Sequence, residues 1–338
     1  ARHSMLLQSP LAGRGWSLGG APYNDTVKAN DPRFPDHGIS LCDYDPLYQE
    51  KDATLYAISK PDKLIFCEDS DDDALFALVD LRAQGLHDHP DALGVATLIG
   101  NGVPWLVESA YAPRDMNRQR WLHNVPLYRR GHVSPEILRT YHSDTWREVA
   151  LGDAWLEKRD GIVMAQARIP RDAFDYLDFD GDLFDVERTF LFDTQGIFIV
   201  IDRLRATESG AATVSQIWHT PAHIELSENN ATLSRNDKTW HATFAQSILM
   251  HCDVTQHEAP QQDAYYFPEA VNDVLWHAQV ELQEGEMITM AAVFSCDPMH
   301  LTLANGGNVV QCDEIEIDLG AFGDDVKCNS TILLSSGS

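Results

Sequence analysis

The feature that most constrains the fold is a long succession of short apolar runs separated by turn residues. From about residue 53 onward, runs of strand length such as KLIFCE, ALGVATLI, GIFIVIDRL and MITMAAVFSC alternate with Gly, Pro, Asn and Asp. Three segments join successive runs at hairpin spacing: Asn101-Gly102, Asp193-Thr194-Gln195-Gly196 and Asn305-Gly306-Gly307-Asn308. Many strands without β-α-β alternation predict an all-β chain folded as a large antiparallel β-sandwich.

Helical periodicity is confined to two short segments, Ser134–Tyr141 and Asp263–Val274, so we expect few short helices. Residues 1–50 are rich in Gly, Pro, Asp and Asn and predict an extended lead-in arm. Residues 51–338 are predicted to form the sandwich domain. The hydrophobic share of 44% is ordinary for a globular protein and sufficient for a substantial core.

The charge balance limits the classes of partner. A formal net charge of -27 repels phosphates, which argues against nucleic acid or an anionic membrane surface as partner. An acidic polysaccharide stays compatible, because a locally basic cleft can exist on an acidic body. The apolar runs are of strand size and are broken by Gly, Pro or charge, so no membrane span is expected. There is also no G-x-S-x-G, P-loop or dinucleotide motif.

The six cysteines are scattered and include no C-x-x-C, so neither a zinc knuckle nor a redox motif is predicted. Disulfides are the expectation outside the cell and free thiols inside it, and the sequence leaves the pairing open. We expect an extracellular or periplasmic protein.

Three histidines surround the first hairpin. In a strand, side chains two residues apart point to the same face, so His87 and His89 are expected to project together. The Asn101-Gly102 turn folds the next strand back and brings Glu108 near them, and His123 enters the following apolar run, LHNVPLY. Two imidazoles and a carboxylate are a common ligand set for zinc. The alternative is that these histidines lie on a solvated strand.

This combination resembles the β-sandwich domain of the heparinase II/III-like polysaccharide lyases over about residues 50–225. Single motifs are weak, but together they are fairly specific. The elements that carry the resemblance are His87-Asp88-His89-Pro90-Asp91, PWLVES with Glu108, Tyr111, Arg118, Arg120, His123-Asn124, Glu187-Arg188-Thr189, GIFIVIDRL and QIWHT.

The resemblance implies a role for each matched position. His89, Glu108 and His123 correspond to the ligands of the family's metal, zinc or another divalent ion in a structural role. His87 and Tyr111 correspond to side chains of the substrate cleft and are the candidate catalytic residues. The family usually has Asp where Glu108 stands, and the extra methylene would move the carboxylate outward.

The resemblance also implies β-elimination on acidic glycans, which needs a positioned base and a group that stabilises enolate-like charge. In the family an α/α toroid supplies most of these groups, and this chain has no run of amphipathic helices to build one. Catalysis is therefore expected to need a toroid domain beyond this chain. The alternative is a non-catalytic structural or assembly subunit, such as a surface or filament protein. Self-association would then use the terminal segments, whose commoner role is that of frayed ends.

Several other features have two readings. Trp240, Trp276 and the segment Tyr265-Tyr266-Phe267 fit a sugar-stacking platform or core packing equally well. His219 in QIWHT is predicted to be a packed or strand-capping histidine. The acidic run from Asp178 to Asp182 lacks the complete calcium-loop pattern and predicts an acidic turn.

Overall fold

The computed structural model of the chain describes residues 40–43, 61–67, 75–80, 93–108, 120–139, 154–159, 162–169, 183–193, 195–257, 271–322 and 331–334. These residues form four sheets, and every strand pairing among them is antiparallel. The all-β prediction is confirmed. The lead-in arm predicted for residues 1–50 lies outside the described residues, except for the strand Ser40–Asp43.

Two of the sheets lie on the same side of the molecule. The N-terminal sheet contains, in spatial order, β1 (Ser40–Asp43), β2 (Pro61–Cys67), β3 (Phe76–Asp80), β4 (Gly94–Gly100) and β5 (Val103–Val107). The side sheet contains β15 (His251–His257), β16 (Val271–Leu282), β11 (Gly210–Thr220) and β6 (Pro126–Arg130).

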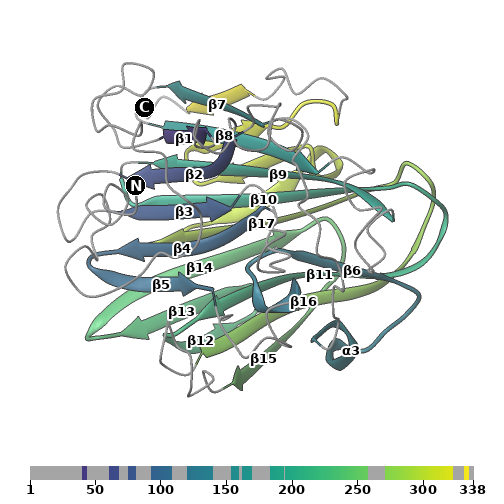
Figure 1. Cartoon of the computed structure of the whole chain (residues 1–338), viewed down its shortest axis with the longest axis horizontal. Helices are drawn as coiled ribbons and strands as arrows, with labels where there is room; N and C mark the ends of the chain where they lie inside the picture. The colour runs from purple at the N-terminus through teal and green to yellow at the C-terminus, as the bar shows by residue number, and fades with distance from the viewer. Residues whose placement is uncertain are drawn as a thin grey trace, which may run out of the picture.

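The other two sheets complete the sandwich. The central sheet contains, in spatial order, β12 (His223–Ser227), β13 (Asn230–Arg235), β14 (Lys238–Gln246), β17 (Met287–Ser295), β10 (Ile197–Ala206), β9 (Phe184–Asp193), β8 (Ile162–Ile169) and β7 (Ala154–Arg159). The C-terminal sheet contains β18 (Leu301–Ala304), β19 (Val309–Cys312), β20 (Ile315–Asp318) and β21 (Thr331–Leu334). Figure 1 shows β8, β9, β10, β17 and β14 as successive rungs of the central sheet.

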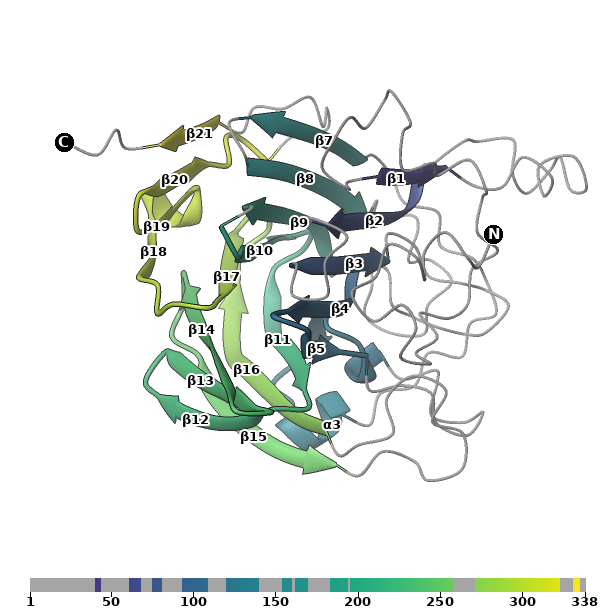
Figure 2. The ribbon, with the colours of Figure 1, turned by 90° about the vertical axis from the view of Figure 1, so that its left-hand side faces the viewer.

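The central sheet is covered on both faces. Figure 2 shows the C-terminal sheet on one side of it and the N-terminal sheet on the other. Its inner face packs on the N-terminal and side sheets in one large apolar cluster, and its outer face packs on the C-terminal sheet in a second cluster. Strands buried on both faces read as continuous apolar runs, which explains why GIFIVIDRL shows so little polar alternation.

The two faces differ in composition because successive residues of a strand point to opposite sides. On β9, Phe190 and Phe192 belong to the inner cluster, whereas Leu191 between them belongs to the outer cluster. Phe192 stacks on Phe66 of β2, with ring centroids 5.6 Å apart. The ring stacking of Trp105 on Trp240, with centroids 5.5 Å apart, joins β5 to β14. Aromatic contacts of this kind hold the inner layers together.

The predicted turns are confirmed where the structure describes them. Asn101 and Gly102 both have positive φ, 53° and 68°, as a tight hairpin between β4 and β5 requires. The segment from Asp193 to Gly196 joins the paired strands β9 and β10. The segment Asn305–Asn308 joins β18 to β19 through the 3-10 helix η3 (Asn305–Gly307).

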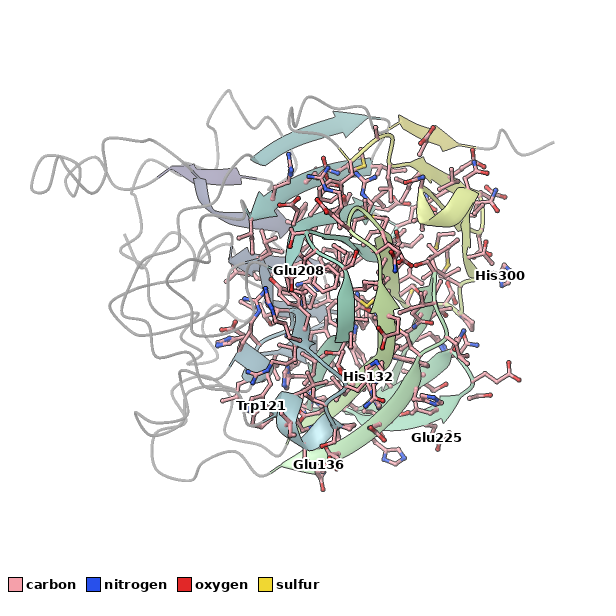
Figure 3. All side chains as sticks on the ribbon, turned by 90° about the vertical axis from the view of Figure 1, so that its right-hand side faces the viewer. Trp121, His132, Glu136, Glu208, Glu225 and His300 are labelled. Atoms are coloured by element: carbon pink, nitrogen blue, oxygen red, sulfur yellow. The ribbon has the colours of Figure 1, made fainter. Side chains whose placement is uncertain are left out.

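The helix predictions had different outcomes. The first is confirmed by α3 (Pro135–Arg139) within Ser134–Tyr141. The second is wrong over residues 271–274, which begin β16 between β11 and β15, and residues 263–270 lie outside the described part. The 3-10 helix η1 (Arg120–Leu122) and α3 cover the outer side of the side sheet, where Trp121 and Glu136 are labelled in Figure 3. Within the described part of the chain, no helix has the length and apolarity needed to cross a membrane.

Candidate functional site

Glu108 and His123 approach the same point from two different elements. Glu108 directly follows β5, and its main-chain N–H donates to the carbonyl of Ala96 on β4 at 3.0 Å, which extends the hairpin by one residue. His123 follows η1, whose turn is closed by the His123 N–H donating to the carbonyl of Arg120 at 3.1 Å. The hairpin and the helical turn therefore fix the backbones of both residues.

The two side chains are in contact. Nδ1 of His123 lies 2.9 Å from Oε1 of Glu108, and the exposed fraction is 0% for the His123 side chain and 19% for the Glu108 side chain. Both side chains can ligate one ion only if His123 binds it through Nδ1, because a metal on Nε2 would lie on the far side of the ring from Glu108. Nδ1 and Oε1 lie close enough to bind the same ion, so the pair supplies one imidazole nitrogen and one carboxylate oxygen of a zinc donor set.

The other predicted site residues lie outside the described part of the chain. These are His87, His89 and Tyr111. Of the three predicted metal ligands, the structure therefore describes Glu108 and His123. Among the residues that the structure does describe, no group of three or more His, Cys, Asp and Glu side chains is arranged to hold a metal. Leu93, which directly precedes β4, is four residues after His89 in the sequence.

Asn124, next to His123, connects the hairpin to the side sheet. Its side-chain Nδ2 donates to the carbonyl of Val95 at 2.7 Å and to that of Val107 at 3.0 Å. Its Oδ1 accepts the main-chain N–H of His219 on β11 at 2.6 Å. Asn124 is fully buried, and unpaired amide groups would be costly there, so these contacts hold the residue in one orientation.

Arg188 on β9 lies beneath the same turn and is fully buried. Its Nη1 donates to the carbonyls of Leu93 at 2.7 Å and Asn124 at 2.6 Å, and its Nε lies 3.0 Å from Oδ1 of Asp202. Burial lowers the pKa of Arg188 to about 10, against the opposing effect of Asp202. Burial also raises the pKa of Asp202, although Arg188 and a hydrogen bond from Gln216 favour its charged form.

A buried histidine and carboxylate adjoin this region. His219 is fully buried, its Nδ1 lies 3.2 Å from Oδ1 of Asn124, and its Nε2 lies 3.4 Å from Oδ1 of Asp273. His219 and Asp273 face each other in the register of β11 and β16. The prediction of a packed histidine is confirmed, and the contact with Asn124 places it next to the residue that follows His123.

Sequence reasoning assigned no role to the buried charges beneath the site. Asp202 interrupts the apolar run GIFIVIDRL, and Arg188 lies within VERTFLFD. A charged residue inside a strand that is covered on both faces needs a partner of opposite sign, and this was the available signal. The sugar-stacking reading is wrong for Trp240 and Trp276, because their exposed fractions of 1% and 3% place both indoles in the core.

Comparison with known proteins identifies relatives of the fold. No family model and no curated protein matches the sequence. Solved structures do match: the heparan sulfate lyase HepC mutant from Pedobacter heparinus has a TM-score of 0.53 at 11% identity, and a heparinase III gene product has a TM-score of 0.55 at 13% identity. Each match covers 80% of this chain.

The chain has a heparinase III-like fold. A further structure named heparinase III gives the same result, with a TM-score of 0.53 at 10% identity. The matched part is 41% of the length of each of these enzymes, so the chain spans about two fifths of the proteins it resembles. At these identities the comparison concerns the fold.

Proposed function

We propose that the chain is the sandwich part of a polysaccharide lyase that acts on acidic glycans, with a divalent metal held by His89, Glu108 and His123. The observation that carries the proposal is the 2.9 Å contact between the buried His123 and Glu108, at the place where the sequence motifs put a ligand set. The heparinase III-like fold supports it, since the matched proteins include a heparan sulfate lyase.

The proposed metal has a structural role. Zinc suits two imidazoles and a carboxylate, and one ion would tie together the segment before β4, the end of β5 and the turn after η1. Because the unfolded chain offers no preformed site, the free energy of metal binding would add to the stability of the fold.

The proposed chemistry is β-elimination, with His87 and Tyr111 as candidate catalytic residues of the cleft. The reaction needs a base for the proton next to the uronate carboxylate and a group that stabilises the resulting negative charge. The remaining groups are proposed to come from a helical toroid domain outside this sequence.

The metal proposal is tested by elemental analysis of the purified chain and of Glu108→Gln and His123→Ala. His132→Ala is the matched control, because His132 is a half-exposed histidine at the far end of β6. We expect one equivalent of zinc in the wild type and in the control, and its loss in both site variants. Wild-type protein without metal after purification and zinc dialysis would refute the site.

The glycan proposal is tested by binding of heparan-type and alginate oligosaccharides and by the absorbance of unsaturated product. We expect binding that is weakened by His87→Ala, and no product from this chain alone. Product formation would show that no toroid is needed, and failure of both glycans to bind would refute the lyase proposal in favour of an assembly subunit.

A further inference from the structure

We propose that Arg188 and Asn124 are positioning residues that hold the segments carrying Glu108 and His123 of the proposed metal site to one another and to the start of β4. The inference rests on the proposed function for the identity of the ligands. It goes beyond that function because neither residue is a ligand and Arg188 lies on the opposite layer of the sandwich.

Arg188 joins the start of β4 to the turn that carries His123. A single nitrogen, Nη1, donates to the carbonyl of Leu93, directly before β4, and to the carbonyl of Asn124, which follows His123. The sequence separations of these contacts are 95 and 64 residues. One guanidinium group therefore sets the distance between two pieces of chain that the hairpin alone does not hold together.

Asn124 joins the end of β5 to the same turn. Its Nδ2 donates to the carbonyl of Val107, the residue directly before Glu108, and to the carbonyl of Val95 on β4. These contacts hold the end of β5 against the turn that carries His123. The start of β4, the end of β5 and the turn that carries His123 are thus joined through two fully buried side chains.

The guanidinium itself has little freedom to move. It is paired with Asp202, whose Oδ2 also accepts from Nε2 of Gln216 at 2.7 Å, and it lies over the ring of Trp218, 5.2 Å from the centroid. A planar guanidinium that is held on several sides fixes the positions of the carbonyls that accept its hydrogen bonds. A lysine ammonium at the same place would lack this fixed planar arrangement of donors. Partners that orient metal ligands in this way typically change affinity by about 10- to 100-fold when they are lost.

The chain offers a matched control for Arg188. Arg203 on β10 is also buried, is paired with Glu187, and donates to two main-chain carbonyls, those of Leu319 and Gly320. Its side chain points to the outer face and fastens the segment after β20, away from Glu108 and His123. Arg188→Lys and Arg203→Lys therefore remove the same chemistry from two different places.

The first experiment measures the zinc dissociation constant by chelator competition, together with Tm, in the wild type and in both lysine variants. We expect both variants to lower Tm and only Arg188→Lys to weaken zinc binding, by about 10- to 100-fold. Equal zinc affinity in the two variants would overturn the inference.

A second pair of variants keeps the test decisive if Arg188→Lys does not fold. Asn124→Asp removes the two Nδ2 donors, and Asn272→Asp is its control, because Asn272 donates to the carbonyl of Ala222 at 2.8 Å. The readout is the ¹⁵N imidazole spectrum of His123 in metal-free protein, which does not depend on zinc. A shift in Asn124→Asp alone supports the inference even if the wild type binds no zinc. An unchanged spectrum in Asn124→Asp refutes it, whatever the metal content.

Discussion

The two faces of the central sheet contain the same kind of ion pair and use it differently. On two neighbouring rungs, Glu187 faces Arg203 and Arg188 faces Asp202 across β9 and β10. The Arg188–Asp202 pair lies on the inner face and holds the turns around the candidate site, whereas the Arg203–Glu187 pair lies on the outer face and holds the C-terminal segment. Because successive side chains of a strand point to opposite faces, the neighbouring residues Glu187 and Arg188 belong to ion pairs that hold different parts of the molecule.

The comparison also shows what these pairs contribute. Burial raises the pKa of both carboxyls, Asp202 and Glu187, in spite of the arginine beside each. A buried ion pair costs so much desolvation that its net contribution to stability is small, although loss of one partner is costly. We infer that both pairs specify register and geometry: a slip of one residue between β9 and β10 would separate both pairs at once.

The largest expected effect comes from truncating one core side chain on each face of the central sheet, an aromatic one on the inner face and an aliphatic one on the outer face. Phe192→Ala removes a ring stacked between two layers, and we expect a loss of about 3–5 kcal/mol in the free energy of unfolding. Leu191→Ala, one residue away on the outer face, is expected near the lower end of about 2–5 kcal/mol. Urea unfolding measures both. An equal or larger loss for Leu191→Ala would mean that the faces are equally well packed.

A smaller effect comes from one glycine on each face. A Cβ at Gly100 would lie 2.1 Å from the Trp240 ring, and a Cβ at Gly307 would lie 2.5 Å from Oγ1 of Thr289, with φ at +89°. We expect Gly100→Ala to cost about 1–3 kcal/mol by overpacking. Gly307→Ala combines overpacking with left-handed strain of about 1–2 kcal/mol, so it should cost more.

Thermal unfolding of the two glycine variants gives the check. The order would be reversed if the Thr289 side chain rotated away while Trp240, fixed by its stacking on Trp105, could not move. In that case the inner face would be the more rigid one, and the comparison between the faces would be sharper.

The smallest effect concerns pH and the outer pair. Because burial raises the pKa of Glu187 in the folded state, the protonated form is favoured there relative to the unfolded chain. The stability that this group contributes is therefore fully present below the unfolded pKa of about 4.3 and is lost as pH rises through the folded pKa. Glu187→Gln cannot ionise, so its stability should fall less than that of the wild type over this range. Parallel pH profiles for the two proteins would contradict the raised pKa.

Local features of the fold were predictable from the sequence, and distant ones were not. Asn101-Gly102 predicts its hairpin because both residues accept positive φ. The same hairpin explains why Glu108 was expected near the site. The helix expected near Val271 failed because the pairing of β16 with β11 and β15 decides that segment, and both partners are remote in sequence or not evident from periodicity.

The candidate site was predictable to the same extent. The contact between Glu108 and His123 joins residues 15 apart, and motif spacing indicated it. The contact between Arg188 and Leu93 joins residues 95 apart, and no local pattern reports it. The run that follows His123 forms β6, which pairs with β11 in the side sheet, while the carbonyl of Asn124 accepts from the main-chain N–H of Val95 on β4.

The long-range contacts of Arg188 and Asn124 have a consequence for the time course of folding. Closing loops of 64 and 95 residues costs chain entropy before any contact is gained, and folds dominated by such pairings reach the native state slowly. The hairpin of β4 and β5 can form early, since its strands are adjacent in sequence. The Arg188 contacts around the point where Glu108 meets His123 have sequence separations similar to those of the pairings of β10 with β17 and of β11 with β6. A refolding chain is therefore expected to form its local hairpins first, and this site together with the long-range pairings of the sheets.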